Sequence, residues 1–432
     1  MTKAGPSADG QAERTAIVLF NLGGPDGPRA VQPFLFNLFN DPAIIGAPGP
    51  VRWLLAQLIS RRRAPVARAI YDHLGGGSPL LANTRAQASA LQDALHSTPP
   101  ETSHLSTAPP TAPGVPTSAT PGAPTGPTLS DPPTCRVFVC MRYWAPQSDA
   151  VAQEVARWQP DRILLVPLYP QFSTTTTGSS FSDWDRAARR AGLQAPTRRV
   201  CCWPLDGGWI AALADLLAAG LTEAARQAPG AEPRILFSAH GLPEKIVAGG
   251  DPYAWQVEQT AAAIVAGLGQ AQPARSLARP LERGRDWQVC YQSRVGPLAW
   301  IGPDTEAEIA RAGADGRALV VVPVAFVSDH SETLVELDIE YRATAEAAAV
   351  PAYVRVPVVA THPTFIAGLA GVVRQALARH TTQPVNQAGG RLCPAGFGRC
   401  PCQASVLPSA ALPAAPPSGT APAGGAGAVR PT

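Results

Sequence analysis

Short apolar runs alternate along the chain with longer segments of helical periodicity. Runs of this length and β-branched content are typical of strands that are buried on both faces. They predict strands at 16–20, 136–140, 161–168, 198–202, 234–238, 287–291, 318–325 and 353–358. Helices are predicted at 34–39, 51–59, 147–157, 209–225, 255–268, 304–312 and 364–379. Because strand and helix alternate, the pattern predicts an α/β protein with parallel sheets covered by helices on both faces.

The order of these elements predicts two Rossmann-like domains, each with a parallel four-stranded sheet, and an active-site cleft between them. In open α/β sheets the binding site lies at the carboxyl ends of the strands. Residues 15–200 would form the N-terminal half and residues 201–380 the C-terminal half. The helix at 360–380 can complete the N-terminal half.

Three segments have compositions that predict disorder. Residues 1–14 are polar, residues 96–134 are rich in Pro, Ser and Thr, and residues 403–432 are rich in Ala, Pro and Gly. Such segments bury too little apolar surface to offset the entropy that is lost on ordering. Residues 381–402 form a separate extension that contains three cysteines.

Charge and composition exclude several classes of protein. A net charge of +3 over 432 residues gives no electrostatic footprint for nucleic acid, so we expect no nucleic-acid partner. No apolar run reaches the roughly 18 residues of a membrane-spanning helix, and the N-terminus lacks the layout of a signal peptide. We therefore expect a cytoplasmic protein, whose eight cysteines bind metal or pack in the core rather than form disulfides.

Four carboxylates follow the seventh predicted strand. Asp329, Glu332, Glu336 and Glu340 are spaced by three, four and four residues, which would place them on one face of an α-helix. Like charges at that spacing destabilise a helix by a few tenths of a kcal/mol each. A metal ion, with the imidazole of His330 as a further ligand, would relieve that cost. The alternative is a solvated acidic first turn favoured by the helix dipole.

His240 follows the strand at 234–238 and precedes the sequence Gly-Leu-Pro. An imidazole titrates near neutrality, which suits proton transfer at cellular pH. A single histidine at the end of a strand is more often structural. His240 and the acidic segment, however, follow two strands in equivalent places, so both are expected at the same edge of the sheet.

Eight short motifs, in this order, resemble those of the ferrochelatase family. They are NLGGP at 21–25, YPQFS at 169–173, TGSS at 177–180, SAHGLP at 238–243, GDPY at 250–253, YQSRVGP at 291–297, WIGP at 300–303 and SDHSETLVELDIEY at 328–341. The resemblance covers residues 15–380 apart from the segment at 96–134. It implies insertion of Fe(II) into protoporphyrin IX to give protohaem with release of two protons, the last step of haem biosynthesis. Protoporphyrin IX and ferrous iron are the partners it implies, while peripheral membrane contact and the oligomeric state stay open.

The resemblance also implies roles for individual residues. His240 would take protons from the porphyrin or bind the central metal, and Glu332 would be its partner across the cleft. Asp329, His330 and Glu336 would extend an acidic path for iron or protons. The macrocycle must be bent to expose its nitrogen lone pairs, so apolar walls should grip it. The candidates for the walls are Leu22, Tyr143, Trp300 and Phe326, and those for the propionates are Arg142 and Arg62 or Arg63.

Arg61, Arg62 and Arg63 end the second predicted helix, so a solvated helix end is the alternative to a role in binding a ligand.

A further signal lies in the extension, where Cys393, Cys400 and Cys402 fall within ten residues. Thiolates held by a loop rich in Gly and Pro suit an iron–sulfur cluster, although structural zinc also takes four thiolates. The resemblance implies a C-terminal [2Fe-2S] cluster with a fourth cysteine from the core. In one branch of the family that cysteine lies in the Tyr-Pro-Gln loop, where this chain has Thr174. Cys202 is therefore the first choice for the fourth ligand and Cys201 the second.

Two other functions stay open beside a protohaem-forming ferrochelatase. One is a chelatase for another metal or tetrapyrrole, such as cobalt or coproporphyrin. The other is a non-catalytic haem or iron–sulfur sensor on the same fold.

Overall fold

The structure is a computed structural model that describes residues 13–97, 134–271, 279–294, 298–379, 381 and 383–402. Residues 1–12, 98–133 and 403–432, for which disorder is predicted, lie outside the described residues. At the edges of that prediction, Arg14 belongs to a strand, His96 to a helix and Thr134 to another strand.

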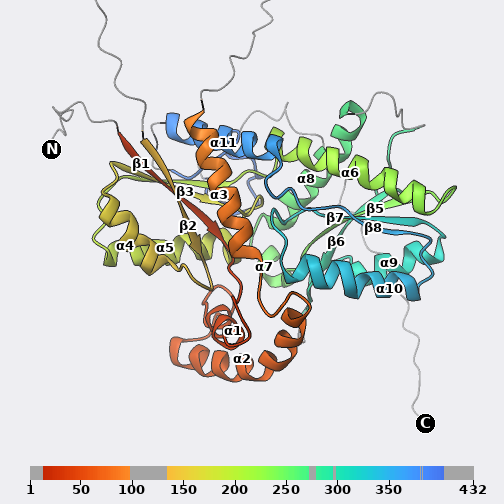
Figure 1. Cartoon of the computed structure of the whole chain (residues 1–432), viewed down its shortest axis with the longest axis horizontal. Coiled ribbons are helices and arrows are strands. Elements are labelled where there is room, and N and C mark those ends of the chain that lie inside the picture. Colours follow the sequence, from red (N-terminus) through yellow and green to blue (C-terminus); the bar gives the residue numbers. More distant parts are fainter. Residues whose placement is uncertain are drawn as a thin grey trace, which may run out of the picture.

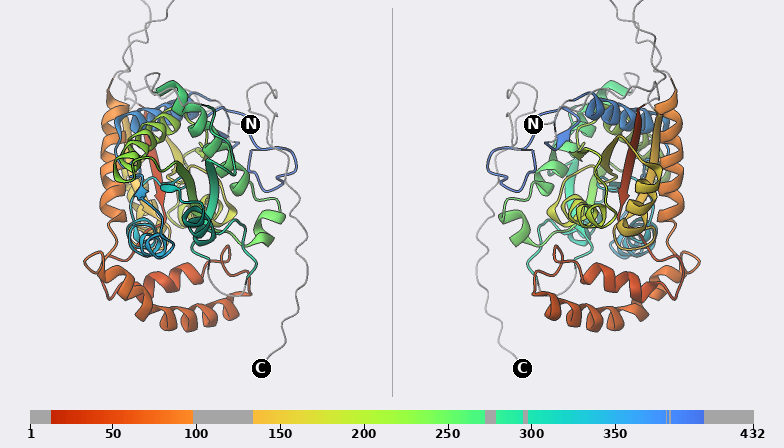
Figure 2. Two further views of the ribbon diagram at one scale, coloured as in Figure 1. Left: turned by 90° about the vertical axis from the view of Figure 1, so that its right-hand side faces the viewer. Right: turned by 90° about the vertical axis from the view of Figure 1, so that its left-hand side faces the viewer.

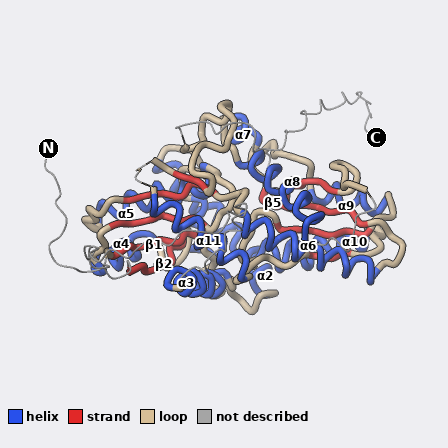
Figure 3. Tube along the Cα trace, turned by 90° about the horizontal axis from the view of Figure 1, so that it is seen from above, coloured by secondary structure: helices blue, strands red, loops and turns tan. Residues whose placement is uncertain are grey.

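The described part of the chain forms a five-stranded and a four-stranded sheet that lie side by side (Figures 1 and 3). Every strand pair is parallel. The first sheet has the order β2-β1-β3-β4-β9, with β1 Arg14–Asn21, β2 Thr134–Met141, β3 Arg162–Pro167, β4 Thr197–Cys202 and β9 Val385–Asn386. The second has the order β6-β5-β7-β8, with β5 Pro233–His240, β6 Trp287–Gln292, β7 Ala318–Pro323 and β8 Tyr353–Arg355. The predicted α/β class with two parallel sheets is confirmed. The first sheet has one strand more than predicted, because the cysteine-containing extension adds β9.

The helices cover both faces of the sheets (Figure 3). They are α1 Val31–Phe39, α2 Gly49–Asp72, α3 Leu80–His96, α4 Ser148–Trp158, α5 Ser179–Arg190, α6 Gly207–Gln227, α7 Glu244–Ala248, α8 Tyr253–Ala271, α9 Thr305–Ala314, α10 Tyr341–Ala347 and α11 Pro363–Ala378. Two segments with wider π-helical turns, η1 Thr174–Gly178 and η2 Glu332–Glu340, complete the set. The C-terminal helix α11 packs against α3, β3 and β4 of the first sheet and against α6.

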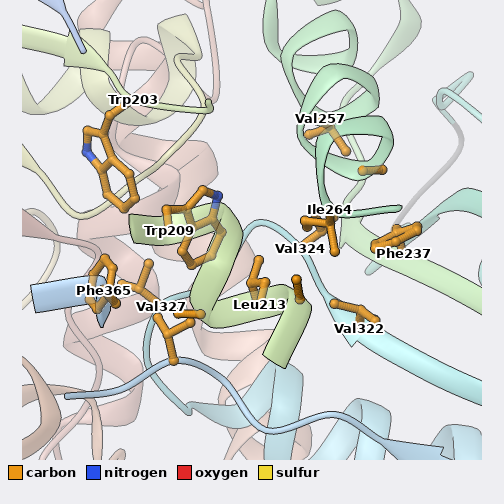
Figure 4. Packing of buried hydrophobic residues seen from close by; sticks show 14 of the residues in the cluster. Trp203, Trp209, Leu213, Phe237, Val257, Ile264, Val322, Val324, Val327 and Phe365 are labelled. Atoms are coloured by element: carbon orange, nitrogen blue, oxygen red, sulfur yellow. The ribbon is translucent and has the colours of Figure 1, made fainter. Parts of the chain in front are cut away.

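One continuous core joins the two sheets. The same hydrophobic cluster contains Ile17 of β1 and Val320 of β7. At its centre the rings of Trp203, Trp209 and Phe365 lie with centroids 5.6 to 6.0 Å apart (Figure 4). Offset and edge-on aromatic pairs of this kind contribute about 0.5–1.5 kcal/mol beyond their buried area. The two sheets are therefore held together by packing as well as by the chain connections.

The N-terminal helices differ from the prediction in two ways. The run of arginines at 61–63 does not end α2, which continues through Pro65 to Asp72. Proline in a helix removes the bond to the carbonyl four residues earlier, and that residue is the exposed Arg61. Water can then satisfy the freed carbonyl, so the helix continues. Helix α3 was not predicted at all.

Together α1 and α2 form a lobe below the sheets (Figures 1 and 2).

One helix in the described part of the chain, α6, is long and apolar enough to cross a membrane by length and composition alone. It packs against α8, α11 and β7 in the fold.

Candidate active site

His240 and Glu332 meet at the carboxyl edge of the second sheet. His240 is the last residue of β5, and Glu332 begins η2, which follows the neighbouring strand β7. The imidazole Nδ1 and the carboxylate Oε2 are 2.9 Å apart. Gly241 comes next, and a side chain there would meet Gln292 O at 3.0 Å and Trp300 Cε3 at 3.3 Å. Glycine therefore lets the chain turn closely beneath the imidazole.

The electrostatics of this pair keep the imidazole basic. The His240 side chain is 41% exposed, but enough protein surrounds it that desolvation favours the neutral ring. The charge of Glu332, its hydrogen bond and the charge of Glu336 outweigh desolvation, so the pKa of His240 is raised above 6.5. In Glu332, burial opposes ionisation, but the charge and hydrogen bond of His240 lower the pKa to about 2. Glu332 is therefore ionised at neutral pH, and Nδ1 carries the shared proton.

Glu336 is held by four hydrogen-bond donors. Its carboxylate accepts bonds from Gln292 Nε2 at 3.0 Å, Ser293 N at 2.8 Å, Ser293 Oγ at 2.6 Å and Tyr341 Oη at 3.1 Å. Burial and the charge of Glu332 nevertheless raise the pKa of Glu336. Glu336 thus has a higher proton affinity than Glu332.

Gln292 and Ser293 were not identified as site residues from the sequence, although they lie in the motif at 291–297. Gln292 is paired in register with His240 and also accepts a bond from Ser238 Oγ at 2.7 Å. Ser293 has a φ of 60°, a left-handed conformation that is strained for serine. This conformation aims both its N–H and its hydroxyl at Glu336. This conformation is the feature that draws attention to Ser293, and only the structure shows it.

His330 has a different environment from His240. Its side chain is buried, its Nδ1 accepts a bond from the backbone N–H of Glu332 at 3.1 Å, and its ring packs edge-on against Phe326. Burial lowers the pKa of His330. The neutral ring with an unprotonated Nδ1 therefore holds the first turn of η2 in place.

The prediction that four carboxylates share one helical face is wrong. The helix begins at Glu332 rather than at Asp329, and its turns are π-helical. Asp329 accepts a bond from Thr333 and pairs with Arg355 Nη1 at 3.1 Å, while Glu340 is exposed at the other end. Of the four, the structure brings Glu332 and Glu336 close to His240.

The residues considered for the porphyrin fall into two groups. Trp300 and Phe326 are half-buried beside Gly241 and His330, close to the His240–Glu332 pair. Leu22 and Tyr143 belong to the cluster that packs α1 and α2.

Tyr143 is only 1% exposed and donates its hydroxyl to Asp41 at 2.7 Å. Arg142 also pairs with Asp41, at 2.8 Å, and donates to Ser179 Oγ. Both side chains are thus engaged in the fold, whereas Arg62 and Arg63 are exposed on α2. Contacts of Tyr143, Arg142, Arg62 and Arg63 with a porphyrin remain predictions.

The loop between β7 and η2 is fixed by side chains from the N-terminal half. Gln171 Nε2 donates to Val324 O at 3.1 Å, and Asn83 Nδ2 donates to Asp329 O at 3.1 Å. Gln87 donates to Val327 O at 2.9 Å and accepts from Ser328 Oγ at 2.8 Å.

These anchoring residues were also missed. Gln171 lies in the motif at 169–173, but Asn83 and Gln87 lie on the unpredicted helix α3.

Five cysteines converge at a second place. Cys201, Cys202, Cys393, Cys400 and Cys402 share one buried cluster with Phe172, and all five are free thiols. Consecutive strand residues normally point to opposite faces. Here the register between β4 and β9 shifts between Val200 and Cys202, and both core cysteines lie in the cluster with the cysteines of the extension.

The sulfur atoms are in direct contact. Sγ of Cys201 is 3.1 Å from Sγ of Cys402 and 3.4 Å from Sγ of Cys202. Within the described ranges, no group of three His, Cys, Asp or Glu side chains is spaced to hold a metal ion as it stands. Buried thiols gathered in this way are nevertheless the donor set that iron–sulfur clusters and structural zinc require. Thr174, in the loop where one branch of the family has its fourth ligand, donates to Asp251 instead.

An imidazole–carboxylate pair at the carboxyl edge of a parallel sheet, with a second carboxylate of higher proton affinity beside it, defines an α/β enzyme of acid–base chemistry. The comparisons specify which class. The family model described as Ferrochelatase matches residues 14–109 and 128–377. The chain is 46% identical to a ferrochelatase of Caulobacter vibrioides over 391 residues, which cover 90% of this chain and 98% of that protein. It is 45% identical to a ferrochelatase of Phenylobacterium zucineum over 390 residues, with the same coverage. The chain therefore belongs to the ferrochelatase family, and the resemblance seen in its motifs is confirmed.

A solved structure described as SirB from Bacillus subtilis with Fe3+ is similar over 57% of this chain and 84% of that chain, at 14% sequence identity. Its TM-score of 0.39 is too low to support an inference.

The electrostatics of the pair give a test that needs no substrate. In Glu332→Gln the charge that raises the pKa of His240 is lost while desolvation remains, so this pKa should fall. NMR titration of the histidine side chains would measure it. The matched control is Glu340→Gln, which removes an exposed carboxylate of the same helix and should leave the titration unchanged. An unchanged His240 pKa in Glu332→Gln would contradict the electrostatic description of the pair.

Proposed function

We propose that the protein inserts Fe(II) into protoporphyrin IX and forms protohaem, in the last step of haem biosynthesis. The observation that carries this proposal is the His240–Glu332 pair, 2.9 Å apart, in a chain that belongs to the ferrochelatase family. The reaction involves no redox change. Two pyrrole N–H bonds break, the metal takes the place of the two protons, and both protons must reach acceptors.

His240 is the residue that accepts a pyrrole proton. Its Nδ1–H donates to ionised Glu332, so Nε2 presents the lone pair that a base needs. The positive imidazolium that forms is stabilised by the negative charge of Glu332, as the raised pKa of His240 indicates.

The second proton requires a further acceptor. Glu336 supplies it, because its pKa is raised by burial and by the charge of Glu332. Gln292 donates both to Glu336 and to the backbone carbonyl of Glu332, and it thereby sets the distance between the two acidic residues.

The porphyrin itself would lie against apolar side chains near the pair. Trp300 and Phe326 are half-buried next to the pair and supply such surface, with Leu22 at the α1–α2 lobe. Arg62 and Arg63 are exposed and offer cations to the propionates.

The activity is tested by anaerobic addition of Fe(II) and protoporphyrin IX and by following haem formation in the visible spectrum. The wild-type protein should form haem. His240→Ala should lower the rate by about 10²–10⁴-fold, the usual contribution of a general base. Glu340→Gln should retain the wild-type rate.

Two outcomes would overturn the substrate or the activity. Turnover only with coproporphyrin or Co(II) would keep a chelatase but change its substrate. No turnover with any pair would favour a haem or cluster sensor.

We also propose that the five-cysteine cluster holds a [2Fe-2S] cluster. Cys393, Cys400 and Cys402 would be ligands, with Cys202 as the fourth and Cys201 as the alternative. Five buried thiols exceed the four ligands that the cluster needs. When bound, the cluster would supply one-electron redox capacity and would tie the extension to the core. The presence of free thiols also supports a cytoplasmic location.

Single serine variants distinguish the two core cysteines. Cys202→Ser should abolish the cluster, whereas Cys201→Ser should keep it. Iron and acid-labile sulfide content and the visible spectrum of anaerobically purified protein are the measurements. If the wild-type protein contains zinc but no sulfide, the five-cysteine cluster is a structural zinc site and not a [2Fe-2S] site.

We further propose that α2 makes peripheral contact with an anionic membrane. Val51, Leu54 and Leu58 lie on one face of α2 and are 48% to 62% exposed. Three exposed arginines follow at 61–63. An apolar face beside cations favours the interface of an anionic bilayer, where each basic residue contributes about 1 kcal/mol.

Sedimentation with vesicles tests this contact. The protein should bind vesicles that contain phosphatidylglycerol more than vesicles of phosphatidylcholine alone. The double variant Leu54→Ser, Leu58→Ser should lose most of the bound fraction. The control is Ile339→Ser, which changes an exposed apolar residue away from α2. Equal binding to both vesicle types, or no effect of the double variant, would rule the contact out.

A further inference from the structure

One buried amide lies directly against the five-cysteine cluster. Gln256, on α8, is fully buried. Its Oε1 accepts a bond from the backbone N–H of Phe172 at 2.7 Å. Its Nε2 donates to Sγ of Cys393 at 3.1 Å and to Sγ of Cys202 at 3.5 Å. The amide therefore bridges the Tyr-Pro-Gln loop and two of the cysteines.

The network fixes the orientation of this amide. A backbone N–H can only donate, so the atom that faces Phe172 must be the oxygen. The NH₂ group then points at the sulfur atoms. It has two N–H bonds and two sulfurs within reach, Cys202 and Cys393. Cys201 instead has its sulfur against that of Cys402.

We infer that Gln256 is a positioning residue that donates to the ligand thiolates of Cys202 and Cys393 and thereby raises the reduction potential of the cluster. This inference rests on the proposed cluster. Reduction adds a negative charge that spreads onto the ligand sulfurs, and N–H donors stabilise that charge. Donation to Cys202 rather than to Cys201 also favours Cys202 as the fourth ligand.

A purely structural role for Gln256 would leave the potential unchanged. Its neighbour one turn later, Thr260, provides the comparison. Thr260 is equally buried and donates to Pro204 O at 3.0 Å and to Gln256 O at 2.9 Å, but its bonds include no sulfur. Removing the Thr260 hydroxyl perturbs the same region of the core without removing a donor to the cluster.

The experiment is a spectroscopic redox titration of the anaerobically purified holoprotein. Gln256→Met fills nearly the same volume without an N–H donor, and its midpoint potential should shift to a more negative value at unchanged iron and sulfide content. Thr260→Val should keep the wild-type potential. A Gln256→Met protein with the wild-type potential, or with a shift no larger than that of Thr260→Val, would overturn the inference.

A second variant guards against misfolding, because Met also removes the acceptor for Phe172. Gln256→Glu keeps that acceptor and places a carboxylate oxygen beside the thiolates, so the potential should again become more negative. A wild-type potential in this variant would overturn the inference too. The inference would also be supported if both Gln256 variants lost iron and sulfide but kept the wild-type unfolding midpoint. In that case Thr260→Val should still hold an intact cluster. If the wild-type protein itself holds no iron and sulfide, the proposed cluster fails and the inference fails with it.

Discussion

The position of Glu332 depends on hydrogen bonds that cross from the N-terminal half to the loop between β7 and η2. Gln171, Gln87 and Asn83 bind the backbone of this loop at Val324, Val327 and Asp329. Gln87 and Gln171 are buried, so losing one of these amides would leave backbone carbonyls unpaired at about 1–3 kcal/mol each. His240, by contrast, is fixed by its own sheet. The two residues of the 2.9 Å contact are therefore positioned separately. The second sheet positions His240, and side chains of the N-terminal half position the loop that leads to Glu332.

The π-helical turns of η2 complete this arrangement. Such turns are rare and are frequently found at functional sites. In η2 they keep Glu332 and Glu336 near His240, while Asp329 before the helix turns to Arg355 and Glu340 reaches solvent. A regular α-helix with all four carboxylates on one face would have concentrated negative charge there. The observed geometry leaves two carboxylates near one imidazole. His240 and Glu332 bond to each other, and Glu336 accepts four bonds of its own.

The sequence predicted the strands well and the helices less well, for physical reasons. A strand buried on both faces, such as β7, is a continuous apolar run that few other structures produce. Helix α3 carries buried polar residues, among them Thr84 and Gln87, which interrupt the apolar pattern. Arg61 to Arg63 and Pro65 are helix-ending signals, but α2 continues through them because these residues are exposed and water can satisfy the carbonyl that Pro65 leaves unpaired.

The sequence could predict only those parts of the site that directly follow a predicted strand. His240 and Glu332 follow strands that the sequence located, so their meeting could be expected from the parallel topology. The contacts of Gln292, Ser293 and Gln256 could not be expected, because they depend on backbone conformation and on the packing of distant segments. The same holds for the cysteines, since Cys201 and Cys202 are adjacent in β4 and both join the cysteines of the extension beside an irregular pairing with β9.

The environments of Glu332 and Glu336 give these two carboxylates different proton affinities. Glu332 faces a group that becomes a cation, which favours its ionised form and lowers its pKa to about 2. Glu336 faces Glu332, and the donors around it only partly offset burial and that repulsion, so its pKa is raised. In the proposed reaction, a proton taken by His240 is thus held next to a carboxylate that remains ionised. Under the proposed function, Glu336, the carboxylate with the higher proton affinity, accepts the second pyrrole proton. Groups whose pKa values are driven apart in this way can take separate proton-transfer roles in one site.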